Sequence, residues 1–365
     1  MRIVVISAKC HPWNSPRAFR ADELTKEFAR QGHDVTLYAL LGDFDYDSYA
    51  KTTGVRIKSL GSPRWGLIDT TGGGKRSFWV KVIEHSVGKY LDFPDCALKK
   101  MVKKTLDNEG EIDLLITIAV PHAIHFGASL AKLDNVKKWI GDCGDPFMGN
   151  PFSKKPFYMA GWERKWCKRV DYITIPIEEG VNAYYPEFRE KIRVIPQGFS
   201  FEETSLIEYK KKEVPTFAYA GYIYPGQRDP VKMLDYLRSL AIDFRFYIYT
   251  SPECGNYLQP YIEDFKDKLV VKSYIPRKEL ITTLSGMDFL VNICNNSSVQ
   301  QPSKLIDYAI TRRPILNVST EFSEKERRNL SFFLDGDYSA AYVVKDIEKY
   351  NIKSVVHQFL ELAYE

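Results

Sequence analysis

A pattern suited to binding a diphosphate lies in the last third of the chain. Pro302 can open a helix after a polar loop, and Ser303 and Lys304 follow it directly. Free amides at a helix N-terminus, a hydroxyl and an ammonium group together suit a diphosphate. Asp307 lies one turn further along the same face, where its carboxylate could accept hydrogen bonds from ribose hydroxyls. The alternative interpretation is an ordinary capped helix that carries a surface lysine.

A second basic position follows a strand predicted over 215–221. That strand ends at Gly221, and a glycine-containing loop leads to Arg228 just before the next helix. The guanidinium group is a fork of donors that matches phosphate oxygens, and Lys232 is a weaker second candidate for the same anion. Taken alone, this segment is better described as an ordinary turn with a surface arginine.

Polar side chains also follow two buried strands in the first half of the chain. Asp142 and Asp145 follow one strand, and paired acids there suit acid–base chemistry or contacts to sugar hydroxyls, although turn and capping roles fit them equally well. His122 and His125 follow another strand. No carboxylate stands at the spacing of a metal motif, so we expect no metal there. His122 is expected to contact a ligand or to cap its helix.

Basic side chains mark two further helices. Arg17 and Arg20 open a helix predicted over 17–31, where they could meet anionic substrate groups; the alternative is a salt-bridged surface helix. A basic helix face further along is ordinarily just solvated, but it could also touch anionic lipid, at about 1 kcal/mol per charge. This face consists of Lys99, Lys100, Lys103 and Lys104.

All these positions depend on an alternation of short apolar runs with amphipathic stretches, which predicts parallel βαβ units and doubly wound α/β sheets. Strands are predicted over 2–7, 34–40, 54–58, 113–119, 136–140, 171–175 and 192–196 in the first half. In the second half they are predicted over 215–221, 244–250, 269–272, 287–293 and 314–318. No G-x-G-x-x-G motif follows the first strand, which disfavours a dinucleotide oxidoreductase.

The alternation pauses at 197–214, where glycine and charged residues indicate an exposed linker. We therefore expect two domains, 1–197 and 198–346, followed by a helix over about 347–365. Ligands of open α/β sheets bind at the carboxyl ends of the strands. The motifs above should therefore line a cleft between the two domains that can close on a ligand and exclude water.

Composition excludes several classes of protein. The 365 residues include 51 basic and 47 acidic side chains, for a net charge of +4, which is too balanced for a dedicated nucleic-acid binder. The 6 cysteines are widely spaced without a C-x-x-C pair, which favours a reduced compartment over a disulfide framework or zinc cluster. We find no membrane span or signal peptide, so we expect a cytoplasmic protein.

Taken in order, the motifs resemble those of a known family. They run from the Pro-Arg helix through Gly-His-Asp-Val-Thr-Leu (32–37), Trp-Ile-Gly-Asp-Cys-Gly-Asp-Pro (139–146), Val-Asp-Tyr-Ile-Thr (170–174) and Val-Ile-Pro-Gln-Gly-Phe (194–199) to the loop at 221–228 and Pro-Ser-Lys-Leu-Ile-Asp-Tyr (302–308). This ordered set resembles the retaining GT-B glycosyltransferases, specifically glycosyltransferase family 4 of the polysaccharide-biosynthesis type. The resemblance covers nearly the whole chain.

The resemblance implies two Rossmann-like domains that face each other across a cleft. The acceptor would bind to the first domain and a nucleotide-sugar donor to the second, and the last helix would pack back on the first. The implied reaction is transfer of a hexose, with retention of configuration, from a UDP- or GDP-sugar to a hydroxyl of a lipid-linked or polysaccharide precursor at the inner membrane face. No metal and no other cofactor is implied.

The resemblance also assigns residues. Arg228 matches a donor-phosphate position, Lys304 the diphosphate-facing loop and Asp307 the ribose-binding acid, while the segment around Tyr274 is expected to shape the choice of base. The expected donor-binding residues are Gly221, Arg228, Lys232, Tyr274, Ile275, Ser303, Lys304 and Asp307. The expected catalytic residues are His122, Asp142 and Asp145, with Arg17 and Arg20 on the acceptor side.

Two positions depart from the family pattern. Val299 stands where the family has the first of two acids eight residues apart, and Tyr222 replaces the usual arginine after the strand glycine. These departures keep open a second hypothesis, a non-catalytic nucleotide-sugar-binding component of a polysaccharide-assembly complex. A GT-B phosphorylase or epimerase ranks last, because no lysine lies in a setting that suggests a pyridoxal phosphate site.

Overall fold

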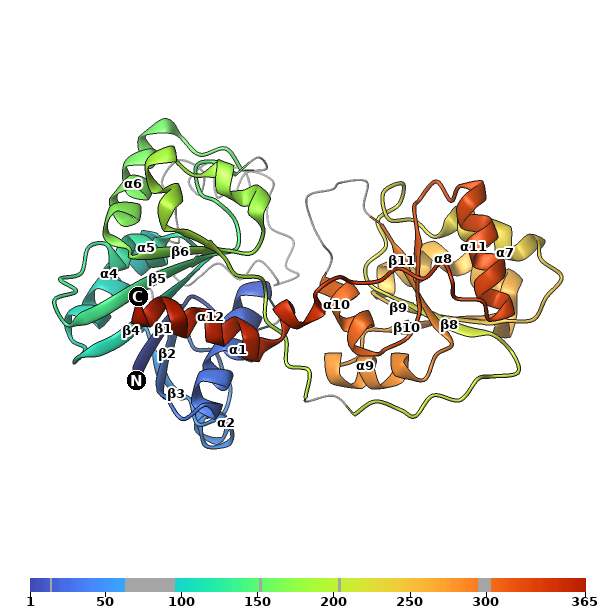
Figure 1. Cartoon of the computed structure of the whole chain (residues 1–365), viewed down its shortest axis with the longest axis horizontal. Helices are drawn as coiled ribbons and strands as arrows, with labels where there is room; N and C mark the ends of the chain where they lie inside the picture. Colours follow the sequence, from blue (N-terminus) through green and yellow to red (C-terminus); the bar gives the residue numbers. More distant parts are fainter. Residues whose placement is uncertain (14, 63–95, 151–152, 203–204, 295–302) are drawn as a thin grey trace. The chain divides into compact units, whose positions relative to one another are not determined.

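The structure is a computed structural model that describes residues 1–13, 15–62, 96–150, 153–202, 205–294 and 303–365. Val299 and Pro302 lie outside these residues, and so does the part up to residue 95 of the helical segment that the sequence predicts over 77–107. The chain divides into two compact units (Figure 1). The first comprises Met1–Ser200 together with Lys349–Glu365, and the second comprises Phe201–Glu348.

The first unit is built on a parallel sheet in the order β3-β2-β1-β4-β5-β6-β7. The strand order reverses between β1 and β4, which places a topological switch point at their carboxyl ends. The strands are β1 (Arg2–Ser7), β2 (Asp34–Ala39), β3 (Arg56–Ser59), β4 (Ile112–Ala119), β5 (Val136–Cys143), β6 (Tyr172–Ile175) and β7 (Ile192–Val194).

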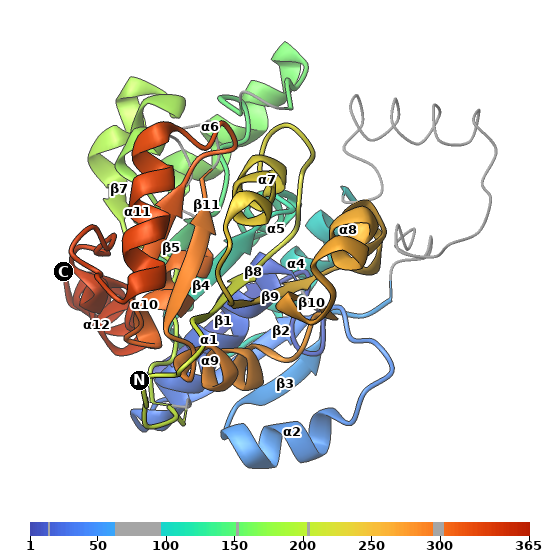
Figure 2. The same ribbon diagram turned by 90° about the vertical axis from the view of Figure 1, so that its right-hand side faces the viewer.

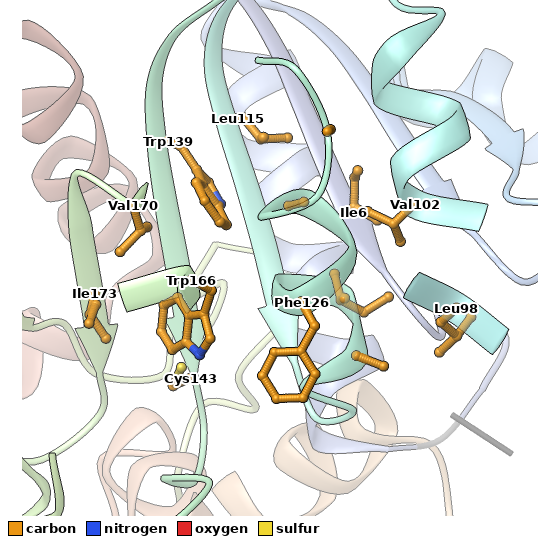
Figure 3. Close-up of a cluster of buried hydrophobic side chains, with 14 of the residues drawn as sticks. Ile6, Leu98, Val102, Leu115, Phe126, Trp139, Cys143, Trp166, Val170 and Ile173 are labelled. Atoms are coloured by element: carbon orange, nitrogen blue, oxygen red, sulfur yellow. The ribbon is translucent and has the colours of Figure 1, made fainter. Parts of the chain in front are cut away.

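Helices cover both faces of this sheet, because successive strand residues point to opposite faces and both sets are apolar. Val4, Ile6 and Leu115 face one core together with α4 (Cys96–Asp107), α5 (Ala123–Ala128) and α6 (Ala160–Arg169) (Figure 3). Ile3 and Val5 face the opposite core, with α1 (Pro16–Arg30) and α12 (Ile352–Tyr364). The C-terminal helix therefore belongs to the first unit, although the chain reaches it through the second.

The second unit repeats this plan with a parallel sheet in the order β10-β9-β8-β11-β12. Helices α7, α8 and α11 gather on one face of the sheet, and α9 and α10 on the other (Figure 1, Figure 2). The strands are β8 (Thr216–Ala220), β9 (Arg245–Thr250), β10 (Leu269–Ser273), β11 (Phe289–Ile293) and β12 (Ile315–Val318). The helices are α7 (Val231–Ser239), α8 (Pro252–Phe265), α9 (Arg277–Ser285), α10 (Ser303–Ile310) and α11 (Glu324–Asp335).

The fold class predicted from the sequence is confirmed: both sheets are parallel and carry helices on both faces. Apolar periodicity predicts helices over 17–31, 77–107, 229–240, 257–265, 277–285, 303–311 and 347–364. It missed α2 (Tyr46–Thr53), α6 and α11, which are all rich in polar residues. Short 3-10 turns at Phe157–Met159, Glu178–Ala183, Pro186–Lys191, Lys266–Lys268 and Ile347–Tyr350 complete the elements. Within the described ranges, no helix is both long enough and apolar enough to cross a lipid bilayer.

Candidate functional site

The carboxyl ends of β8 and β11 define the topological switch point of the second unit, where open α/β sheets bind ligands. Gly221 directly follows β8 and has φ 147°, a region that disfavours any side chain. A Cβ at this position would lie 3.2 Å from the Tyr219 hydroxyl and 3.8 Å from Cδ of Lys304. The positive φ and the close approach of the Tyr219 hydroxyl therefore favour glycine here, while the distance to Lys304 is an ordinary van der Waals contact.

Lys304 extends from the first turn of α10 across this strand end. Its ammonium lies 4.5 Å from the centroid of the Tyr219 ring and donates to the Ile293 carbonyl at 3.5 Å. Burial and, to a smaller extent, the positive charge of Arg228 together lower the pKa of Lys304 to about 7. Two cations held close together, one of them desolvated, form a site that gains strongly from an anion.

Arg228 is positioned by a tight turn in the β8–α7 connection. Its backbone amide donates to the Tyr224 carbonyl at 2.8 Å, and Gly226 adopts φ 75° within the turn. The Thr320 hydroxyl donates to the Gln227 carbonyl at 2.6 Å and so ties the turn to the segment after β12. The turn that carries Arg228 is therefore fixed by backbone and side-chain hydrogen bonds, and the joint role of Arg228 and Lys304 in binding a diphosphate stays a prediction.

Asp307 lies one turn beyond Lys304 and pairs with Arg277 at the start of α9. Both Nε and Nη2 of Arg277 donate to Oδ1, at 2.8 and 2.6 Å. Burial raises the pKa of Asp307 above its usual value, and the charge of Arg277 partly offsets this rise. In the described part of the chain no hydrogen bond is made to Oδ2, which leaves one oxygen to accept from a ligand hydroxyl.

Tyrosine rings surround the outer edge of this site. Tyr274, at the end of β10, is 52% exposed, and Tyr222 and Tyr224 lie with their ring centroids 4.7 Å apart. Ile275 follows Tyr274 and is half-buried. Exposed aromatic rings of this kind can stack on a planar base. The role of Tyr274 and Ile275 in the choice of base is compatible with this exposure and stays a prediction.

Lys232 does not join the cationic pair. Its side chain is exposed on α7 and forms an ion pair with Glu321, so the predicted phosphate contact is not supported. The backbone of Ser303 opens α10 as predicted.

The acid–base role predicted for Asp142 and the acceptor contact predicted for Arg20 both need correction. Arg20 is only 2% exposed, and its Nε and Nη2 donate to the two carboxylate oxygens of Asp142 at 3.2 and 2.8 Å. Thr174 also donates to Asp142, at 2.8 Å. Burial alone would raise the pKa of Asp142, but Arg20 and Arg17 hold it below its usual value. This is a structural ion pair, because neither side chain reaches the surface.

Arg17 and Asp145 keep access to solvent at the same strand ends. Arg17 lies over Gly144, where a Cβ would approach its guanidinium carbon to 2.7 Å, and it contacts Asp142 at 3.3 Å. Asp145 is exposed on the next turn. This half-buried cation and exposed carboxylate suit an acceptor that carries hydroxyl or anionic groups.

His122 links two loops of the first unit. Its Nε2 lies 3.1 Å from the Asp145 carbonyl, so this nitrogen carries the proton and Nδ1 is left as an acceptor. Burial lowers the pKa of His122 to about 4, and the ring is therefore neutral at neutral pH. A neutral imidazole can position a hydroxyl or accept its hydrogen bond, but it is a poor general acid.

His125 contributes to the core rather than to a site. Its Nδ1 lies 2.8 Å from the Thr117 hydroxyl, and its ring stacks on Trp166 with centroids 4.5 Å apart. Among the described residues, no group of three histidine, cysteine or acidic side chains could hold a metal ion.

Sequence reasoning missed two residues of the donor-side site. Arg277 pairs with Asp307, and Tyr219 supports Lys304. Both could have been found from the sequence. Arg277 opens the helix after β10, and Tyr219 stands next to the end of β8; parallel strands bring such positions together at one edge of the sheet.

No protein-family model and no curated protein sequence matches this chain. Solved structures match it along its whole length. TarM superposes with a TM-score of 0.62 at 9% identity, covering 100% of this chain and 99% of TarM. A glycosyltransferase from Rickettsia africae gives 0.61 at 12% identity, covering 99% and 97%. HepE of Anabaena, solved in complex with UDP-glucose, gives 0.59 at 7% identity, covering 99% of each chain.

The protein has the GT-B fold. At these identities the likeness establishes the fold alone. In the GT-B fold of this chain, the second unit carries the cationic pair and the first carries the acidic and histidine loops.

Proposed function

We propose that the protein is a retaining glycosyltransferase that moves a hexose from a UDP- or GDP-sugar to a hydroxyl of a lipid-linked or polysaccharide precursor. The observation that carries this proposal is that Lys304 lies beside Gly221 and 4.5 Å from the Tyr219 ring at the switch point of the second unit, where the positive charge of Arg228 acts on both Lys304 and Tyr219. A similar fold in HepE has been solved with UDP-glucose, and the sequence resembles glycosyltransferase family 4.

The chemistry follows from the charges. Cleaving the bond between sugar and diphosphate leaves negative charge on the phosphate and positive charge on the sugar. Lys304 and Arg228 would stabilise the departing diphosphate, and the amides that open α10 would add to this field. In a front-face mechanism the leaving phosphate accepts the proton of the acceptor hydroxyl, so no protein nucleophile is needed. We assign Asp145, His122 and Arg17 to binding the acceptor.

We propose that no metal is required, because the two side-chain cations supply the charge that a divalent ion would otherwise provide. Nucleotide release from UDP- and GDP-sugars, measured with and without a membrane lipid extract, tests the function. Release that requires an acceptor and persists in EDTA supports the proposal. Tight donor binding without turnover on any acceptor would instead indicate a non-catalytic binding component.

The ionisation of Lys304 gives a prediction for pH. Only the charged lysine attracts the diphosphate, and the pKa of Lys304 is about 7 in the free protein. Affinity for UDP-glucose should therefore fall as pH rises above 7, by as much as about tenfold per pH unit, because one pKa unit corresponds to 1.36 kcal/mol. Calorimetric titration across this range measures the effect. Lys304→Arg keeps its charge and should bind with nearly constant affinity; a fall of equal slope in that variant would contradict the assignment.

Asp307 is expected to hold the ribose. Asp307→Ala should weaken UDP-glucose binding by about 1–3 kcal/mol, because a charged hydrogen bond is lost from an enclosed site. Fluorescence or calorimetric titration measures this, and Asp335→Ala, an exposed acid on α11, serves as the control. Unchanged donor affinity in Asp307→Ala would reject the ribose contact.

A further inference from the structure

Tyr219 lies where two neighbouring strands of the second sheet separate. Strand β8 pairs with β9 as far as Ala220, but it pairs with β11 only as far as Ala218. Beyond this point the Ala220 amide donates to the Tyr308 hydroxyl at 2.7 Å. Tyr219 has no exposed surface. Its side chain is therefore enclosed at the switch point and cannot adjust its position freely.

The ring of Tyr219 faces the ammonium of Lys304. This nitrogen lies over the ring, 4.5 Å from its centroid, and its hydrogen bond to the Ile293 carbonyl is long, at 3.5 Å. Among the described residues, no acidic side chain forms an ion pair with Lys304. An aromatic face attracts a desolvated cation more strongly than an exposed one. The Tyr219 ring is therefore a main source of stabilisation for the charged lysine in the free protein.

The hydroxyl of Tyr219 contacts the loop that carries Arg228. It donates to the Tyr222 carbonyl at 3.0 Å, at the beginning of that loop. Further along, the Tyr224 amide donates to the Arg228 carbonyl at 3.1 Å. Burial raises the pKa of Tyr219, and the positive charge of Arg228 and a side-chain hydrogen bond with it partly oppose this rise. One neutral hydroxyl thus joins both ends of the loop.

We infer that Tyr219 is a positioning residue of the diphosphate site: its ring binds the Lys304 ammonium, and its hydroxyl fixes the loop that carries Arg228. This inference rests on the proposed function, in which both cations bind the diphosphate of the donor. Because Tyr219 is wholly buried, it acts through the two cations and not by contact with the donor. The two roles can be separated, since phenylalanine keeps the ring and loses the hydroxyl, whereas leucine loses both.

The role of the ring makes the titration of Lys304 depend on Tyr219. An aromatic face favours the charged lysine, so it opposes the lowering of the pKa of Lys304 by burial. None of the other titratable groups that face Lys304 or Tyr219 is altered in the variants of Tyr219 below. These groups are Arg228, Cys294, Tyr274 and Cys254.

NMR titration of the full chain without any ligand tests the role of the ring. Lysines are labelled with ¹³C at Cε, and the signal of Lys304 is identified by its absence in Lys304→Arg. Its midpoint should lie at about pH 7 in the unaltered protein. Y219L should lower the midpoint by about one pH unit, because a cation–π contact at a desolvated site is lost. Y219F should leave it near the unaltered value. A purely structural role of Tyr219 would not produce this difference.

A second NMR observation needs no variant of Tyr219. Protons that lie over an aromatic face are shifted upfield by the ring current. The ε protons of Lys304 should therefore resonate upfield of those of the exposed lysines Lys51 and Lys325. This measurement decides the position of the ring even if Y219L does not fold.

Calorimetric titration with UDP-glucose below pH 7, where Lys304 is charged, tests the role of the hydroxyl. Y219F should weaken binding by about three- to tenfold, because the loop that carries Arg228 loses a hydrogen bond. The matched control is Y236F, which removes a hydroxyl 2.9 Å from that of Ser331 in the same unit. It should bind UDP-glucose as the unaltered protein does.

Three results would overturn the inference. A Lys304 midpoint in Y219L equal to or above the unaltered value would reject the role of the ring, as would ε protons without an upfield shift. Equal donor affinities in Y219F and Y236F would reject the role of the hydroxyl. If the unaltered protein binds neither UDP-glucose nor GDP-mannose, the proposed function fails, and the diphosphate role of Tyr219 falls with it even where the lysine titrates as expected.

Discussion

Lys304→Ala is expected to weaken binding of UDP-glucose between about tenfold and about 150-fold. A hydrogen bond to a charged group contributes about 1.5–3 kcal/mol, and here the diphosphate would lose one of its two cationic side-chain partners. Arg228→Ala should cause a loss of similar size, because its positive charge lies near enough to Lys304 to lower the pKa of the lysine. Calorimetric titration measures both.

The expected stability of Lys304→Ala gives an independent check. In the free protein the ammonium is desolvated and repelled by Arg228. Removing it should leave thermal stability unchanged or raise it, even though donor binding is weakened. Lys232→Ala, which breaks an exposed pair with Glu321, is the control and should bind the donor normally. Equal donor affinities in Lys304→Ala and Lys232→Ala would show that the assigned pair does not hold the donor.

The second large effect concerns stability in the first unit. Arg20→Ala should destabilise this unit by about 3–5 kcal/mol, because it leaves Asp142 as a buried charge without its main partner. Arg20 also donates to the Pro196 carbonyl at 2.6 Å, so the segment that leaves the sheet should loosen as well.

Urea unfolding followed by tryptophan fluorescence measures the stability of the first unit. All 6 tryptophans precede residue 200, so the fluorescence signal does not come from the second unit. Lys137→Ala is the matched control: it removes an exposed pair with Asp113 and should cost less than about 1 kcal/mol. If Arg20→Ala costs no more than Lys137→Ala, the Arg20–Asp142 pair is not the structural element described above.

The sequence predicted the sheets well because their strands are apolar on both faces. Val4 and Val5 pack into opposite cores, and such continuous apolar runs are easily recognised. Helix α6 was missed because its outward face is basic and its inward face mixes Glu163 with tryptophan and cysteine. Helix α11 begins with a recognisable sequence signal, the capping box of Ser323 and Glu326. The helix was missed because the prediction was made from apolar periodicity and did not consider capping residues.

The roles of charged residues were harder to predict than the elements that carry them. Arg20 and Asp142 are 122 positions apart, so their pairing follows only from the order of β1, β4 and β5 in the sheet. The same holds for Arg277 and Asp307, which meet because α9 and α10 lie on one face. By contrast, Lys304 and Arg228 each follow a strand that borders the switch point, so a shared site for them could be predicted from the strand order alone.

A crystal structure with UDP bound tests the central claim most directly. We expect the diphosphate to lie at the carboxyl ends of β8 and β11, with its oxygens within hydrogen-bonding distance of the Lys304 ammonium and the Arg228 guanidinium. A diphosphate bound elsewhere, with neither cation in contact with it, would contradict the account.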